Sequence, residues 1–198
     1  PERGHLSPGM FCVGGDSHSP TGGAFGAYMF GIGATEMAGV LATGEIWIKV
    51  PETILIKWAG QTDAFVTAKD MMLATCAKIG MGGGRYQAIQ YAGEAIHKLN
   101  MQERMTMSNM AAELGAQAGL ISPDETTIEY LKSVNASTLD NWQNYQIEKP
   151  DLNGEVINLD ASSLSPQIAA PHSPENSSDV DDFKKSFGFG VRYRVPVL

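Results

Sequence analysis

The chain has 198 residues, with 14 lysines and arginines against 22 aspartates and glutamates, so its formal net charge is −8. This acidic balance argues against a nucleic-acid-binding protein, because contact with phosphates needs a basic face. Hydrophobic residues make up 43% of the chain and charged residues 18%, which excludes a disordered protein and is enough for a folded core.

The sequence contains no run of 18 apolar residues, so we expect no membrane partner. Residues 1–5 lack the basic and apolar pattern of a signal peptide, so we expect a protein of the cytoplasm or an organelle matrix. The two cysteines, Cys12 and Cys76, lie far apart in apolar segments. Their number and spacing fit neither a disulfide framework nor a zinc site, so we expect two buried thiols and no metal.

The first predicted element is a buried strand over residues 9–15, an apolar run that ends in two glycines. A polar loop, 16–20, follows its carboxyl end. Residues 22–44 carry large apolar side chains among many glycines and alanines, which predicts one or two closely packed helices. The β-branched and aromatic residues at 46–60 predict two strand halves with a break at Pro51-Glu52.

Capping patterns predict the helices that follow. Thr67-Ala-Lys-Asp70 resembles a capping box, and Asn100-Met-Gln-Glu103 and Ser122-Pro-Asp-Glu125 share its pattern. The elements expected from here on are a helix over 67–80, a strand over 87–92, and helices over 101–118 and 123–134.

The alternation of strands and helices over residues 9–134 predicts a layered α/β domain with a mainly parallel or mixed sheet. We expect residues 1–135 to form this domain. Residues 136–182 are more polar, and we expect a linker and the start of a further segment there, with a small helix at 140–145 and a strand at 155–160. We expect residues 183–198 to form a separate tail.

The strongest candidate for chemistry is the sequence Gly15-Asp16-Ser17-His18 at the end of the first strand. Ligands of open α/β sheets bind beyond the carboxyl ends of strands, so a small carboxylate substrate can be held there. Asp16 could orient the imidazole of His18 and raise its basicity. A second interpretation stays open, namely a turn in which Asp16 caps a helix and His18 bonds a loop.

Asn109 and Glu113 lie four positions apart and therefore share one face of the predicted helix, among methionines and alanines. Such a polar pair either completes a buried network or points into a site, and the residues alone do not decide between the two. The glycine run 82–84 lacks both the P-loop pattern and the dinucleotide-binding pattern, so we interpret it as a plain loop.

Several independent motifs resemble the aconitase superfamily, and within it the 3-isopropylmalate dehydratase large-subunit family. Together they cover roughly residues 8–182. The motifs are Gly15-Asp-Ser-His-Ser-Pro-Thr-Gly-Gly-Ala-Phe-Gly-Ala27, Phe30-Gly-Ile-Gly-Ala-Thr-Glu36, Val40-Leu-Ala-Thr-Gly44, Thr67-Ala-Lys-Asp70, Gly93-Glu-Ala-Ile96, Arg104-Met-Thr-Met-Ser-Asn-Met110, Glu113-Leu-Gly-Ala-Gln-Ala-Gly119 and Pro123-Asp-Glu-Thr-Thr127.

The resemblance implies an aconitase-type fold and a hydro-lyase that dehydrates and rehydrates a hydroxy-di- or tricarboxylate such as 3-isopropylmalate. It also implies an iron–sulfur cluster that acts as Lewis acid at the substrate hydroxyl. By the same resemblance Asp16 and His18 are catalytic, with His18 helping to protonate the departing hydroxyl. Ser17, Asn109 and Glu113 would line the cavity.

The sequence departs from the family pattern in its cysteines. The family supplies three cluster cysteines in Gly-Ser-Cys-Thr-Asn and Cys-x-x-Cys motifs, and neither motif is present. Two thiols at unrelated positions do not make a three-ligand pocket, so we expect no four-iron cluster in this chain alone. The family's swivelling domain is also missing, and a complementary subunit or swivel domain is therefore an expected partner.

Two alternatives to the family function remain open. The first is a cluster-free hydro-lyase or isomerase in which Asp16 and His18 do the acid–base work alone. The second is a non-catalytic, truncated subunit that pairs with a partner chain through exposed apolar surface.

Overall fold

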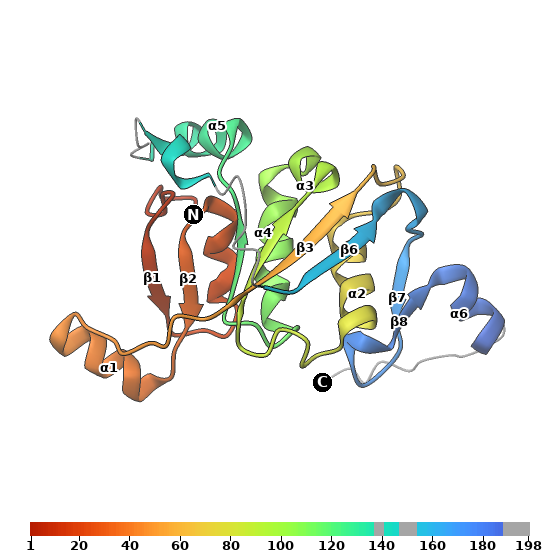
Figure 1. The fold of residues 1–198 in the computed structure, drawn as a ribbon, viewed down its shortest axis with the longest axis horizontal. Coiled ribbons are helices and arrows are strands. Elements are labelled where there is room, and N and C mark those ends of the chain that lie inside the picture. The colour runs from red at the N-terminus through yellow and green to blue at the C-terminus, as the bar shows by residue number, and fades with distance from the viewer. Residues whose placement is uncertain (137–140, 147–153, 188–198) are drawn as a thin grey trace, which may run out of the picture.

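The computed structural model of the chain describes residues 1–136, 141–146 and 154–187. Strands and helices alternate over most of its length, and the strands form three sheets. Figure 1 shows the pair β1–β2 at one end, the main sheet in the centre and the pair β7–β8 at the other end. The expected α/β class is confirmed.

The strands are β1 (Phe11–Gly14), β2 (Tyr28–Gly31), β3 (Thr53–Ala59), β4 (Ala88–Ala92), β5 (Ala118–Ile121), β6 (Val156–Asp160), β7 (Gln167–Ala169) and β8 (Ser177–Asp179). The α-helices are α1 (Ala34–Thr43), α2 (Ala68–Ile79), α3 (Glu94–Lys98), α4 (Met101–Asn109), α5 (Glu125–Ser133) and α6 (Val180–Phe187). Short 3-10 turns are η1 (Ser19–Phe25), η2 (Met110–Ala112), η3 (Trp142–Tyr145), η4 (Ala161–Ser163) and η5 (Pro174–Asn176).

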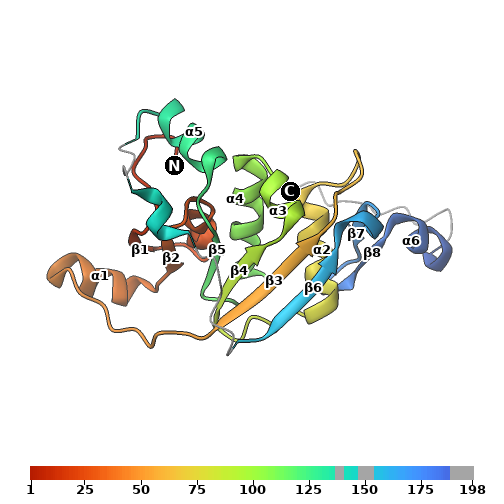
Figure 2. The same ribbon diagram turned by 45° about the horizontal axis from the view of Figure 1, so that its top comes forward.

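The main sheet is fully parallel, with the strand order β5-β4-β3-β6. One of its faces carries the larger hydrophobic core, because alternate residues of each strand point to the same side. Ile56 and Trp58 of β3 and Tyr91 of β4 pack there with Met71 and Met72 of α2. Figure 2 shows α2, α3 and α4 together beside this sheet.

A smaller core joins the parallel pair β1–β2 to the helices. Phe25 of η1 packs with Met101 of α4 and Leu131 of α5. The approach is closest at Gly23, where an added Cβ would lie 1.8 Å from the carbonyl oxygen of Gly119 in β5. Glycine is therefore required at position 23, because the two backbones touch there.

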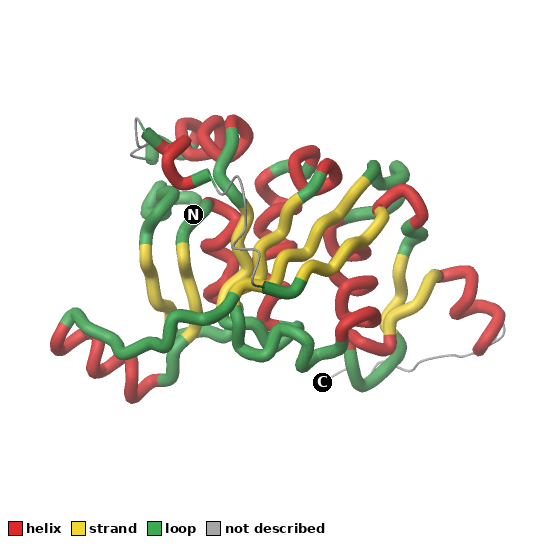
Figure 3. Tube along the Cα trace, in the orientation of Figure 1, coloured by secondary structure: helices red, strands yellow, loops and turns green. Residues whose placement is uncertain are grey.

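The prediction of one or two helices over 22–44 was only partly right. The 3-10 turn η1 ends at Gly26, whose φ of 71° is a left-handed conformation that turns the chain back into β2. Only α1, which begins after Gly33, is an α-helix. Of the two strand halves expected over 46–60, only β3 forms, and Figure 3 shows the preceding residues as a long loop between α1 and β3.

The single helix predicted over 101–118 was also wrong. The helix α4 ends at Asn109, and after η2 the chain turns at Gly115, with φ 69°, into β5. Gly119 lets this strand lie against the helix, since an added Cβ there would meet Ala111 at 2.6 Å. The short helix α3 was not predicted either.

The strand expected at 155–160 is confirmed as β6, and the small helix near 140–145 is a 3-10 turn, η3, in its described part. Asp70 ties the hairpin β7–β8 to α2, because its carboxylate closes the capping box of that helix and also accepts a hydrogen bond from the Gln167 N–H at 2.8 Å. The division at residue 135 stays a prediction. Most of the expected tail lies outside the described residues.

The expectation of two buried thiols holds for Cys76, whereas Cys12 is only half-buried. Cys12 lies on β1, which belongs to a sheet of only two strands. Fewer residues therefore surround it than surround Cys76 in the larger core. Across 1–136, 141–146 and 154–187, no helix combines the length and apolar character that crossing a membrane requires.

Candidate active site

The candidate site begins where β1 ends. After Gly14, the loop turns sharply because the Asp16 carboxylate accepts a hydrogen bond from the His18 N–H at 2.8 Å. The Ser19 hydroxyl donates to the Asp16 carbonyl at 2.7 Å and closes the same turn. Side-chain bonds of this kind to nearby backbone are typical of Asp and Ser in turns. They place His18 immediately before η1.

The imidazole of His18 lies between a hydroxyl and a carboxylate. Its Nδ1 is 3.0 Å from Ser17 Oγ, and its Nε2 is 3.3 Å from Glu113 Oε1. Because an ionised carboxylate can only accept, Nε2 donates its hydrogen to Glu113; the Ser17 hydroxyl donates to Nδ1 when the ring is neutral and accepts from it when the ring is charged. The His18 and Glu113 side chains are 40% and 32% exposed, so both can be reached by a ligand.

Asn109, at the end of α4, is linked to the same loop through Thr21. The Asn109 Nδ2 group donates to Thr21 Oγ1 at 2.9 Å, and Thr21 Oγ1 donates to the His18 carbonyl at 2.7 Å. Glu113 follows η2, four positions after Asn109. The end of α4 and the end of β1 therefore meet at one place.

This geometry brings His18, Asn109 and Glu113 together although 95 positions separate His18 from Glu113. It corrects the expected pairing of Asp16 with the imidazole, because the Asp16 carboxylate holds backbone and the carboxylate beside the ring is that of Glu113. The reason is the tight turn, which uses Asp16 locally. The roles of these residues in a reaction stay predictions.

Sequence reasoning missed Thr21. It lies in a run of small residues after Pro20, where a single hydroxyl gives no periodic signal. The sequence gives only a weak hint of Thr21, namely a polar residue before a run of small and apolar residues, 22–25. The structure buries all four of these residues.

The two cysteines do not fit an iron–sulfur cluster, which is held by several thiolates at one place. Cys12 belongs to β1 and Cys76 to the core face of α2. Burial raises the pKa of both thiols, and with the added negative charge of Glu113 it raises the pKa of Cys76 to about 11. Both are therefore neutral thiols at pH 7, and the described part of the chain holds no group of three or more possible metal ligands.

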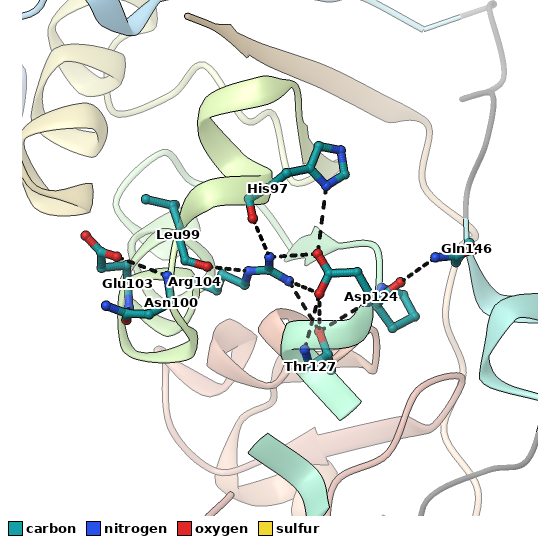
Figure 4. Close-up of polar contacts among 9 residues, drawn as sticks. His97, Leu99, Asn100, Glu103, Arg104, Asp124, Thr127 and Gln146 are labelled. Atoms are coloured by element: carbon teal, nitrogen blue, oxygen red, sulfur yellow. Dashed lines mark hydrogen bonds and ion pairs between the residues drawn. The ribbon is translucent and has the colours of Figure 1, made fainter. Parts of the chain in front are cut away.

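A second polar cluster surrounds the fully buried Arg104 of α4 (Figure 4). Its guanidinium donates to both oxygens of Asp124, at 2.6 and 2.7 Å, and to the carbonyls of His97 and Leu99. The Asp124 carboxylate also caps α5 by accepting from the Thr127 N–H. This cluster ties α3, α4 and α5 together and lies on a different part of α4 from Asn109.

The comparisons with known proteins agree on one family. The model of the Aconitase family (aconitate hydratase) matches residues 1–192. A 3-isopropylmalate dehydratase large subunit of Moorella thermoacetica is 42% identical over 182 residues, which are 92% of this chain and 42% of that protein. A 3-isopropylmalate dehydratase large subunit 1 of Pyrococcus furiosus is 43% identical over 188 residues, covering 93% and 43% of the two chains.

A methanogen homoaconitase large subunit of Methanocaldococcus jannaschii is 40% identical over 184 residues, which are 90% of this chain and 44% of that protein. The chain thus spans less than half the length of the curated relatives it matches. The family model matches nearly all residues of the chain, and the relatives are about 40% identical to it. Both findings lead to one conclusion. The chain belongs to the aconitase family.

Proposed function

We propose that this chain is part of a hydro-lyase or isomerase that dehydrates and rehydrates a hydroxy-di- or tricarboxylate such as 3-isopropylmalate. The observation that carries the proposal is the His18 imidazole, held between Ser17 and Glu113 at the end of β1. Its support from the comparisons is that two relatives are named 3-isopropylmalate dehydratase large subunits. A complementary subunit is the partner that such a name suggests.

In this function His18 is the general acid. The charged imidazolium, which the neighbouring Glu113 carboxylate stabilises, passes its Nε2 proton to the hydroxyl that leaves the substrate and becomes a neutral ring that keeps the proton on Nδ1. Ser17 holds Nδ1 and so fixes the plane of the ring. Asp16 and Asn109 act on the shape of the loop and the cavity. General acid–base catalysis of this kind supplies about 10²–10⁴-fold in rate.

The iron–sulfur cluster of the family would act as a Lewis acid at the substrate hydroxyl. The two thiols of this chain do not fit it, so the steps above use only the chain's own residues. A cluster-free reaction would use the same pair, His18 and Glu113, with Asp16 shaping the turn.

The test is dehydration of isopropylmalate, malate and citrate, followed by the ultraviolet absorption of the unsaturated product. The chain is assayed alone and with candidate partner chains, with and without added iron and sulfide. We expect His18→Ala and Glu113→Gln to lower the rate at least about 10²-fold, and the exposed His5→Ala control to leave it unchanged. A His18→Ala variant with an undiminished rate contradicts the proposal.

A second candidate function is that of a non-catalytic subunit that pairs with a partner. The observation in its favour is the apolar surface of α1 and the following loop, which we call the α1 surface: it comprises Leu41, Trp47 and Val50, each at least 80% exposed. The helix α1 has no buried residue at all. Absence of dehydration under every condition above, together with a stable complex with a partner, favours this function.

A further inference from the structure

The hydrogen bonds around Thr21 fix the orientation of the Asn109 amide. The Thr21 hydroxyl has one hydrogen, and it donates that hydrogen to the His18 carbonyl at 2.7 Å. A carbonyl oxygen has no hydrogen to give, so the direction of this bond cannot reverse. Toward Asn109, therefore, Thr21 Oγ1 can only accept.

The side-chain amide of Asn109 has a donor end, Nδ2, and an acceptor end, Oδ1. Its donor end faces Thr21 at 2.9 Å. Turning the amide over would set Oδ1 against an oxygen whose hydrogen is already used, and Thr21 Oγ1 would lose the bond that it accepts. The donor end is therefore held at Thr21, and Oδ1 faces away from it.

The same threonine also holds the loop that carries the general acid. The His18 carbonyl accepts from the Thr21 N–H at 3.1 Å as well as from its hydroxyl. Thr21 thus connects His18, which lies before η1, with Asn109 at the end of α4. Thr21 and Asn109 are 88 positions apart in the sequence. Asn109 as a whole is only half-buried.

We propose that Thr21 is a positioning residue that makes Asn109 present an acceptor, Oδ1, to the ligand, so that the site selects acids that carry a hydroxyl. This inference rests on the proposed function in that it takes a hydroxy acid as the ligand. A hydroxyl can donate to Oδ1, whereas the matching acid without a hydroxyl cannot. The difference of one neutral hydrogen bond corresponds to about 3- to 10-fold in affinity.

The experiment compares Thr21→Val, Thr21→Ser and wild type, with Thr106→Val as matched control. Thr106 lies on the same helix, α4, and its hydroxyl bonds only the helix carbonyl of Gln102. The first measurement is the hydrogen exchange of the Asn109 side-chain amide by NMR. We expect slow exchange in wild type, Thr21→Ser and Thr106→Val, and at least about tenfold faster exchange in Thr21→Val.

The second measurement is the ratio of the dissociation constants of succinate and malate, which differ by one hydroxyl. We expect a ratio of about 3 to 10 in wild type, Thr21→Ser and Thr106→Val, and a ratio near 1 in Thr21→Val. Rescue by serine and loss by valine separates positioning from a packing role, because valine keeps the shape of threonine.

Fast exchange of the Asn109 amide in wild type, or equal exchange in wild type and Thr21→Val, overturns the proposal even if the valine variant folds poorly. If wild type does not bind malate more tightly than succinate, the part of the proposal that concerns selection of hydroxy acids is overturned. Neither measurement needs turnover, so these outcomes are distinct from failure of the proposed function, which is read from the rate of His18→Ala.

Discussion

At the scale of single residues, the buried charge of Arg104 is compensated by the carboxylate of Asp124. Arg104 is fully buried and Asp124 is 15% exposed, so both lose most of their hydration. Burial by itself raises the pKa of Asp124, but hydrogen bonds and charge from Arg104 outweigh it, and the net pKa is lowered. The paired state is stable because nearly every polar hydrogen of the guanidinium has an acceptor.

We expect Asp124→Asn to lower the free energy of unfolding by about 3–5 kcal/mol, because it leaves the buried guanidinium without a counter-charge. Glu94→Gln is the matched control, since it breaks an exposed pair with Lys98 that contributes little to stability because water screens it. Urea denaturation followed by circular dichroism measures both. Equal losses in the two variants would show that Arg104 does not need its partner.

The same pair sets a pH dependence. A carboxylate whose pKa is lower in the folded state contributes stability above its unfolded pKa of about 3.9, and that contribution is lost as pH falls through the folded-state pKa. We therefore expect wild type to lose stability below about pH 4 and Asp124→Asn to lose less over the same range. Denaturation curves at stepwise lower pH test this, and parallel losses would contradict it.

The sequence singled out His18, Asn109 and Glu113 but missed Thr21 and did not show how these residues bond. The loop from Asp16 to His18 follows an apolar run, and Asn109 and Glu113 lie four positions apart on a predicted helix, so both signals are local. Which carboxylate faces the imidazole depends on how the end of α4 lies against the end of β1. That packing involves contacts far apart in the sequence, which no spacing rule encodes.

At the scale of elements, a close backbone contact joins η1 to β5 at Gly23 and Gly119. We expect Gly23→Ala to cost about 3 kcal/mol or more, since its Cβ would meet the Gly119 carbonyl, which is backbone and cannot move aside alone. Gly39→Ala is the control. It lies in α1 with nothing within 4 Å, and we expect it to stabilise the chain by up to about 1 kcal/mol.

Thermal unfolding followed by circular dichroism reads both glycine variants. A Gly23→Ala melting temperature at or above that of wild type would mean that the backbones at 23 and 119 are not in contact.

Two of the elements that were not predicted are β2 and β5. The strands β2 and β5 have four residues each, too few for a clear alternation of apolar and polar positions. Their glycines and alanines suit close packing as well as a tight turn, so the pattern fits a packed helix equally. The start of α2 was predicted from its capping box, because Thr67 and Asp70 lie within one helical turn. For α5 the sequence placed the cap at Ser122 and Glu125, whereas the structure caps the helix with Asp124 and Thr127.

At the scale of the whole molecule, the α1 surface lies on a helix and loop that project from the rest of the chain (Figure 1). Covering one Trp or Leu side chain is worth about 1.5–3 kcal/mol. We expect Trp47→Ser with Leu41→Ser to lower both self-association and binding of a hydrophobic dye. The control is Ile168→Ser, an exposed apolar residue on β7.

Analytical ultracentrifugation and dye fluorescence measure these effects. If the control reduces association as much as the double variant, the α1 surface has no special part in it.

The convergence of His18 and Glu113 across 95 positions has a consequence for how the molecule is made. Closing a loop of that length costs about 4 kcal/mol of chain entropy beyond a fixed constant, and it must be offset by the packing of η1 on α4 and β5. During synthesis the loop that carries His18 leaves the ribosome long before Glu113 is translated. The loop that carries His18 therefore has no Glu113 to contact until that later part of the chain has been made.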